Sequence, residues 1–241
     1  MGGGGVGGAG GRRAAGAGGR RAARAGGRRA AVSDPAGILS AMDVPRTRPP
    51  RDRHELDAVL SRGFDLIRAV VPRLEHRLVG TAAACLQGVD VPVGDVDLLV
   101  ARRQDVDAVA QALAGLPCVT APRWIEASGQ YFACYSLDGI RFEISTVESP
   151  CAEDGWECQG PGPWRHFVTV VRGGHRIDCV SLELRLTTEF LRDRPDRYRP
   201  LLAHLGAHGA DLPLLRQSMA VRRVPHTLAR LTRELQAATP P

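Results

Sequence analysis

Residues 78–100 read LVGTAAACLQGVDVPVGDVDLLV, and this stretch decides the fold. Its first residues end an apolar run that predicts a strand stopping at Gly80, and TAAACLQG predicts a short helix closed by Gly88. The loop VDVPVG then leads into DVDLLVA, whose apolar run predicts a second, buried strand. Because side chains i and i+2 of a strand face the same way, Asp95 and Asp97 should project together from one sheet face.

Two carboxylates side by side repel each other, and the pKa of one is raised unless a cation offsets the charge. Mg²⁺ prefers oxygen ligands and typically takes one or two carboxylates together with substrate phosphates. Asp95 and Asp97 are therefore candidate ligands of a metal–nucleotide site. The alternative is a solvent-exposed strand entry with no function, because an isolated D-x-D is common.

The dipeptide Gly80-Thr81 follows the first predicted strand. A glycine lets the backbone approach a phosphate closely, and the hydroxyl of Thr81 and the amides at a helix start can donate hydrogen bonds to it. The alternative is an ordinary strand-to-helix turn in which the threonine caps the helix.

A third acid occurs in the later strand-like segment RFEIS. Its alternation puts Glu143 on one face with Arg141 and Ser145, and Phe142 and Ile144 on the other. Glu143 can complete an acidic cluster with the D-x-D motif, or it can form an ion pair with Arg141 or another arginine.

These motifs together resemble the nucleotidyltransferase superfamily, whose signature is a Gly-Ser or Gly-Thr turn, then D-x-D on a strand, then a third acid on a later strand. Thirteen residues separate Thr81 from Asp95. The resemblance is closest to small bacterial members, such as aminoglycoside nucleotidyltransferases and relatives in toxin–antitoxin systems, and its motifs lie within 73–146. The third acid is Glu143 where many members have aspartate, and Asp178 in the strand-like HRIDCVS is a rival for this place.

The resemblance implies a mechanism. Asp95 and Asp97 would hold Mg²⁺, Gly80-Thr81 would bind the β and γ phosphates of a nucleoside triphosphate, and Glu143 would act as general base. An acceptor hydroxyl of a small molecule, protein or RNA would attack the α-phosphorus, and pyrophosphate would leave. A catalytically inactive, antitoxin-like binding module with the same fold is the alternative. Because the chain has no lysine, arginine would have to serve as the phosphate clamp.

The first 41 residues differ in composition from the rest. Residues 10–31 repeat glycine, arginine and alanine, bury little apolar surface and are expected to be disordered. Residues 1–41 hold seven arginines and one acid, whereas the remaining residues hold 25 arginines and 25 acids. The net charge of +6 therefore belongs to this segment, and we expect nucleic-acid binding only through it. The absence of lysine and asparagine indicates a GC-rich gene, in which Met42 is the expected initiator.

Targeting signals and cysteine-based metal sites find little support in the sequence. The sequence has no apolar segment long enough for a signal peptide or a membrane span, so we expect a soluble cytoplasmic protein. The six cysteines include no C-x-x-C pair. Cys151, Cys158 and His166 could be imagined around zinc, but their spacing matches no standard site and incidental thiols are expected.

The remaining periodicities indicate the fold class. A helix is expected over 56–74, followed beyond Val119 by two strand-like runs that meet at Asp138-Gly139, and by a second hairpin at Gly173-Gly174. From residue 181 the pattern is helical. This order predicts an α+β fold, which the resemblance makes a nucleotidyltransferase-like mixed β-sheet with flanking helices and a helical C-terminal region.

The same reading predicts three parts of the chain. Residues 1–52 form the disordered Gly/Arg/Ala-rich and Pro/Arg-rich segment, residues 53–180 form the nucleotidyltransferase-like domain, and residues 181–241 form a helical region that packs on it.

Overall fold

The computed structural model describes residues 45–148, 165–222 and 225–238, and in the last of these ranges the side chains of 229–237. The glycine- and arginine-rich repeat, Met42, Cys151 and Cys158 lie outside these residues, so what the sequence predicts for them stays a prediction.

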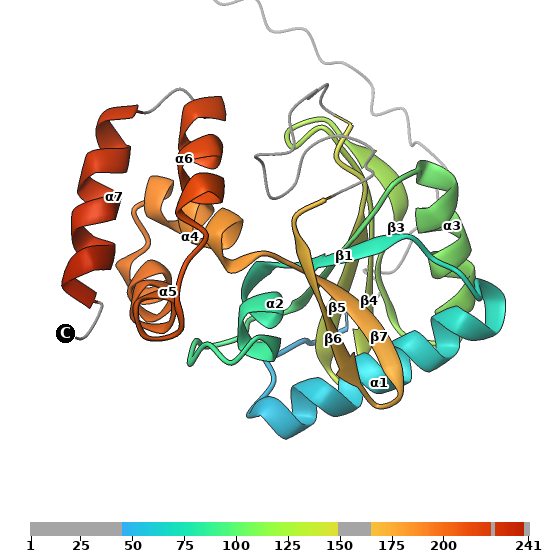
Figure 1. The fold of residues 1–241 in the computed structure, drawn as a ribbon. Coiled ribbons are helices and arrows are strands. Elements are labelled where there is room, and N and C mark those ends of the chain that lie inside the picture. The colour runs from blue at the N-terminus through green and yellow to red at the C-terminus, as the bar shows by residue number, and fades with distance from the viewer. Residues whose placement is uncertain (1–44, 149–164, 223–224, 239–241) are drawn as a thin grey trace, which may run out of the picture. The chain divides into compact units, whose positions relative to one another are not determined.

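Seven strands form one mixed sheet in the order β3-β4-β5-β2-β1-β7-β6 (Figure 1). The pairs β1·β7 and β2·β5 are parallel, and the other neighbours are antiparallel. This arrangement, together with the seven described helices, confirms the predicted α+β class with a mixed sheet. The strands are β1 (His76–Val79), β2 (Val96–Val100), β3 (Cys118–Ile125), β4 (Gln130–Leu137), β5 (Ile140–Ser145), β6 (Phe167–Arg172) and β7 (His175–Val180).

Both predicted hairpins are confirmed. Strands β4 and β5 meet at Asp138-Gly139, where both residues have positive φ angles of 52° and 82°, as a tight two-residue turn requires. Strands β6 and β7 meet at Gly173-Gly174, whose φ angles are 53° and 78°.

The two strands predicted between Val119 and Thr146 are β4 and β5, and the sequence analysis did not predict β3, which precedes them. Strand β3 is an edge of the sheet and is largely exposed, so it lacks the apolar alternation that marks a half-buried strand. It also contains Pro122, which an edge strand tolerates, and its register with β4 shifts twice.

Helices α1 (Arg53–Val70) and α3 (Arg103–Ala112) pack into the main hydrophobic core with the sheet, and side chains of other helices, among them Leu86, Leu184 and Leu214, also belong to it. Asp52 caps α1 by accepting a hydrogen bond from the amide of Glu55, and the helix ends two residues before Pro72. The core side chains include Leu60 and Phe64 of α1, Leu98 of β2, and Phe142 and Ile144 of β5. These strand residues alternate with Asp97 and Glu143, so the acids face away from this core.

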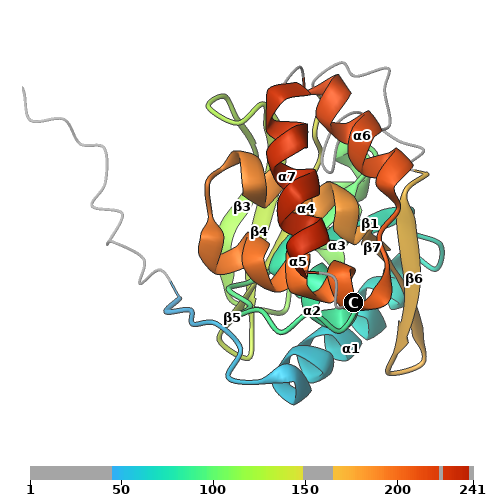
Figure 2. The same ribbon diagram turned by 60° about the vertical axis from the view of Figure 1, so that its left-hand side comes forward.

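The C-terminal helices lie side by side (Figures 1 and 2). They enclose a second hydrophobic cluster, in which Leu186, Phe190, Tyr198 and Leu201 are buried. They are α4 (Leu182–Leu191), α5 (Pro195–His208), α6 (Leu212–Val221) and α7 (Pro225–Ala238). The predicted boundary after residue 180 falls between β7 and α4, and the division into domains there stays a prediction. None of the helices within the described ranges has the length and apolarity needed to cross a membrane.

Candidate functional site

The strand register brings the three predicted acids together. Asp97 of β2 lies between Val79 of the antiparallel β1 and Glu143 of the parallel β5. Asp95 comes two residues earlier, at the entry to β2, and each of the three acids can offer a carboxylate oxygen within 4.8 Å of the others. This acidic trio, Asp95, Asp97 and Glu143, is the cluster that the sequence motifs predict, and its role in catalysis stays a prediction.

Glu143 is not an ordinary surface carboxylate. Its side chain is 17% exposed, and burial raises the pKa of the Glu143 carboxyl above its usual value. The charge of Arg141 opposes this increase, and the charge of Asp95 adds to it. Arg141 forms an ion pair with Glu143, so the ion pair considered from the sequence coexists with the acidic trio. Glu143 therefore belongs to the acidic cluster and also forms the ion pair with Arg141, the two alternatives considered from the sequence.

The turn at Gly80 brings the backbone against the trio. Gly80 has a φ of +71° and begins α2 (Gly80–Leu86), and a Cβ atom added there would collide with Oδ2 of Asp97. The residue at the N-cap is Val79, and Thr81 lies inside the helix with 5% exposure. The alternative in which Thr81 caps the helix is therefore wrong. The positive φ favours glycine here, and a Cβ atom would displace the carboxylate of Asp97.

A cavity of about 280 Å³ opens onto the trio. Gly80 and Thr81 lie in its lining, as do three uncharged side chains, Gln130, Phe132 and Ser145. Further lining comes from the C-terminal helices, which contribute Arg185, Arg192 and Arg197. The cavity thus has an acidic side from the sheet and a basic side from α4 and α5.

The sequence analysis did not predict the basic side of the cavity. Arg185 lies on α4 and Arg192, seven residues later, is the C-cap residue of this helix, so both project from one helix face, and this spacing is the signal that could have found them. The spacing alone does not tell which face of this helix meets the sheet. Arg102 and Arg103, which follow β2 and are the sequence's nearest arginines to the D-x-D motif, pair instead with Asp105 and Glu148.

Asp178, the rival third acid, lies outside the acidic trio. Its strand β7 is separated from β2 by β1, so two strand spacings of about 4.8 Å each separate the two strands. Its Oδ1 accepts a hydrogen bond of 2.6 Å from the hydroxyl of Thr169 on β6. The geometry therefore favours Glu143 as the partner of the D-x-D motif.

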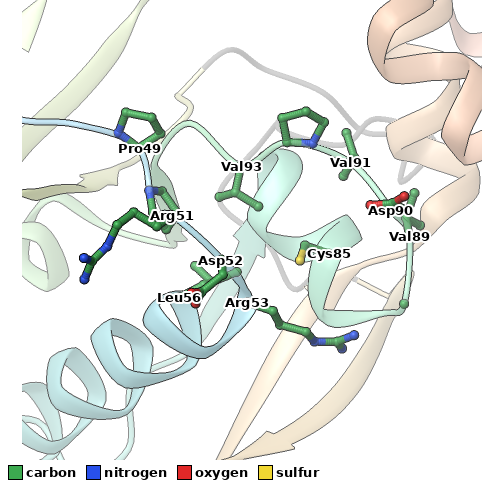
Figure 3. A pocket seen from close by; sticks show the side chains of 13 residues that line it. Pro49, Arg51, Asp52, Arg53, Leu56, Cys85, Val89, Asp90, Val91 and Val93 are labelled. Carbon is green, nitrogen blue, oxygen red and sulfur yellow. The ribbon is translucent and has the colours of Figure 1, made fainter.

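A larger cavity of about 490 Å³ lies where α1 begins, beside the loop between α2 and β2 (Figure 3). Its lining is mainly Pro, Val and Leu, and several of its charged groups already have partners. Arg51 pairs with Glu55, Arg53 donates to the carbonyl of Leu86, and Asp52 caps α1. Of these two cavities, volume alone would favour this one as the functional site, but the charged side chains that converge on the smaller cavity make the smaller one the better candidate.

Acidification is expected to weaken cation binding at the trio. Because burial raises the pKa of Glu143, this carboxyl takes up a proton while the pH is still above its usual value of about 4.3, and a protonated carboxyl is a poor ligand. Mg²⁺ affinity should therefore increase as the pH rises through the raised pKa. Calorimetric titration from about pH 5 to about pH 8 measures this, and the dependence should shrink in Glu143→Gln. A flat profile in the unaltered protein would contradict the expectation.

The comparisons with known proteins concern the fold. No family model and no curated protein matches the chain. Among solved structures, it is similar to a Thermotoga maritima protein described as a candidate nucleotidyltransferase, with 20% identity and a TM-score of 0.47 over 64% of this chain and 94% of that one. It is also similar to the antibiotic-resistance factor ANT(2'')-Ia, with 17% identity and a TM-score of 0.43 over 73% of this chain and 98% of that one.

A nucleotidyltransferase-like protein from Paracoccidioides brasiliensis is similar at 16% identity and a TM-score of 0.44, over 78% of this chain and 94% of that one. The class of this chain is given by its own described elements, which form an α+β fold with one mixed seven-stranded sheet.

Proposed function

We propose that the protein is a Mg²⁺-dependent nucleotidyltransferase that transfers a nucleoside monophosphate from a nucleoside triphosphate to an acceptor hydroxyl. The observation that carries this proposal is the cavity with Asp95, Asp97 and Glu143 on one side and three arginines on the other. A divalent cation bound to a polyphosphate offers positive charge to the first side and negative charge to the second.

The residues of the trio fit a divalent cation of the Mg²⁺ class. They offer carboxylate oxygens only, which hard cations prefer, and the three oxygens converge within 4.8 Å. Arg141 offsets part of their negative charge but is 43% exposed, which leaves a local excess of acid. When bound, the cation would neutralise charge on the phosphates during transfer.

The remaining chemistry is assigned to the chain's own residues. Asp95 and Asp97 hold the cation, and Glu143 accepts the proton of the acceptor hydroxyl. The hydroxyl oxygen forms a bond to the α-phosphorus while the bond from this phosphorus to the pyrophosphate oxygen breaks. The raised pKa of Glu143 makes it a stronger base than an exposed glutamate once its proton has been lost. Gly80 permits the close approach of the backbone to Asp97 that keeps this carboxylate oriented.

The acceptor is named here only by its reacting group. Gln130, Phe132 and Ser145 provide a neutral part of the lining, which suits a nucleoside or an uncharged hydroxyl compound. A small molecule, a protein and an RNA all offer such a hydroxyl, and each belongs in the test.

The test is binding and turnover of the four nucleoside triphosphates by residues 1–241, with Mg²⁺ and with a chelator. We expect Mg²⁺-dependent binding, and pyrophosphate release once an acceptor is supplied. Removing residues 1–41 should leave both intact, because none of the site residues lies there. Absence of any Mg²⁺-dependent binding would overturn the proposal, and tight binding without release for any acceptor class would favour an inactive, antitoxin-like binding module.

A further inference from the structure

The edge strand β6 carries a large share of the exposed apolar surface. Its side chains Phe167, Val168 and Val171 are 42%, 48% and 57% exposed. They are three of the six exposed large hydrophobic side chains in the described ranges, and all three lie within six residues. Because β6 ends the sheet, β7 is its only strand neighbour among the described residues (Figure 2). In this part of the chain, one row of its backbone groups therefore has no strand partner.

The hydrogen bonds of the β6–β7 hairpin show which backbone groups point outward. The amide of Ser181 donates to the carbonyl of His166 at 3.2 Å, so the backbone of His166 faces the chain of β7. This direction reverses at each residue of a strand, so the even-numbered residues of β6 face β7. The two-residue turn between the strands gives the same assignment, because its closing pair exchanges both hydrogen bonds. The outward residues are Phe167, Thr169 and Val171.

The two edges of the sheet differ in their protection. An exposed edge can pair with another chain unless proline, charged side chains or irregular register prevent it. Strand β3 has all of these features, because it contains Pro122 and Arg123 and its register with β4 shifts twice. Strand β6 pairs with β7 in unbroken register, contains no proline, and has a single charged residue, Arg172, at its end. Its edge is therefore regular and open to a further strand.

The sequence of β6 is complementary to itself. Two identical antiparallel strands are related by an axis perpendicular to the sheet, and opposite residues share a sheet face, so the axis passes at one residue. An axis at Thr169 sets its outward groups opposite their own copies. Phe167 then lies opposite Val171 of the second copy, and on the other sheet face Val168 meets Val170. Apolar pairs and a threonine pair stabilise a sheet, and the one charged residue falls outside the paired stretch.

We propose that β6 pairs in the antiparallel sense with β6 of a second copy of this chain, centred on Thr169, so that the protein is a two-fold symmetric dimer. The outward amides and carbonyls of the two copies then bind one another, and the exposed apolar side chains cover one another. This inference goes beyond the transferase activity and does not depend on it. Because the axis is perpendicular to the sheet, the acidic trios of the two copies lie on the same face of one continuous sheet.

Sedimentation equilibrium of residues 1–241 tests the association. We expect a monomer–dimer equilibrium between about 1 µM and about 100 µM, because pairing at one edge buries less surface than a permanent interface does. Val171→Pro removes an outward amide and spares the bonds to β7, so it should raise the dissociation constant of the dimer about tenfold or more. An unaltered protein that stays monomeric over this range would overturn the proposal and leave the edge to a strand of another protein.

A side-chain substitution with a matched control supports the same conclusion if the proline variant fails to fold. Val171→Lys puts a cation into the paired edge, and Val70→Lys makes the same change at a valine of α1 that is 47% exposed. The first should weaken association about tenfold, because lysine on an edge opposes pairing, whereas the second should change it less than about twofold. Equal effects of the two substitutions would overturn the assignment of β6 as the interface.

A disulfide tests the register. Opposite residues of a hydrogen-bonded antiparallel pair have Cα atoms about 5.5 Å apart, which a disulfide can span. Thr169→Cys should therefore cross-link two copies on mild oxidation, above the background that the unaltered protein sets with its own cysteines. Val171→Cys is the control, because its two copies would lie about 14 Å apart, beyond the reach of a disulfide. Equal cross-linking of the two variants, or none above background, would overturn the pairing centred on Thr169.

Discussion

Replacing Asp97 by asparagine is expected to reduce Mg²⁺-dependent transfer by about 10²-fold to 10³-fold, the range typical of a lost electrostatic contact to the reacting groups. Asp97 pairs in register with Glu143 of β5 and lies two residues after Asp95, so it neighbours both other acids of the trio. Asparagine keeps the shape and one oxygen but removes the charge that a hard cation requires. Initial rates of pyrophosphate release at saturating nucleotide measure the effect.

The same substitution should not weaken the fold. In the absence of metal, Asp97 stands beside two other carboxylates, so removing its charge relieves repulsion, and the free energy of unfolding should stay the same or increase. The control is Asp178→Asn, which changes an acid of a strand on the far side of β1. Its transfer rate should remain near that of the unaltered protein. A rate for Asp97→Asn equal to that of Asp178→Asn would remove Asp97 from the mechanism.

Replacing Gly80 by alanine should damage both stability and metal binding. The φ of +71° costs a residue with a Cβ atom about 1–2 kcal/mol, and the new methyl group would collide with Oδ2 of Asp97. Either the turn or the carboxylate must move, and we expect Mg²⁺ affinity to decrease about tenfold, since a shift of one ligand is enough. Denaturant unfolding and calorimetry measure the two effects.

The matched control for this change is Gly94→Ala, one residue before Asp95. Gly94 is not among the glycines with positive φ, and a Cβ atom there meets nothing within 4 Å. Alanine at this position should leave Mg²⁺ affinity unchanged and the free energy of unfolding unchanged or slightly raised, because it restricts the unfolded chain. Similar losses in both variants would mean that the loop, and not the approach of Gly80 to Asp97, is what the substitutions disturb.

The part of the site that local periodicity controls could be predicted from the sequence. Alternation in GDVDLLV and RFEIS puts Asp97 and Glu143 on the polar faces of their strands, and Asp138-Gly139 determines the hairpin that ends with β5. The α+β class followed from the same signals. These features depend on neighbours in the sequence, so no knowledge of the tertiary structure was needed.

The choice between Glu143 and Asp178 depended on strand order, which the sequence does not contain. Both acids lie in strands that follow the D-x-D motif, but β5 pairs with β2 whereas β7 pairs with β1. The arginines were missed for a related reason. Arg185, Arg192 and Arg197 share a short stretch of sequence with Arg194 and Arg199, and only the tertiary packing shows which of these arginines line the cavity. The edge strand β3 was not predicted because its side chains show no regular alternation of buried and exposed positions.

The two sides of the cavity draw mainly on different hydrophobic clusters. The strands that carry Asp97 and Glu143 pack into the main core, which Leu184 of α4 also joins, whereas Phe190 and Tyr198, near the arginines in sequence, pack into the cluster of the C-terminal helices. A ligand that spans the cavity therefore links two cores that are otherwise joined through a few elements. By mass action such a ligand would stabilise the folded arrangement in which both clusters are in place, so that a substrate would also hold the two sides of the cavity together.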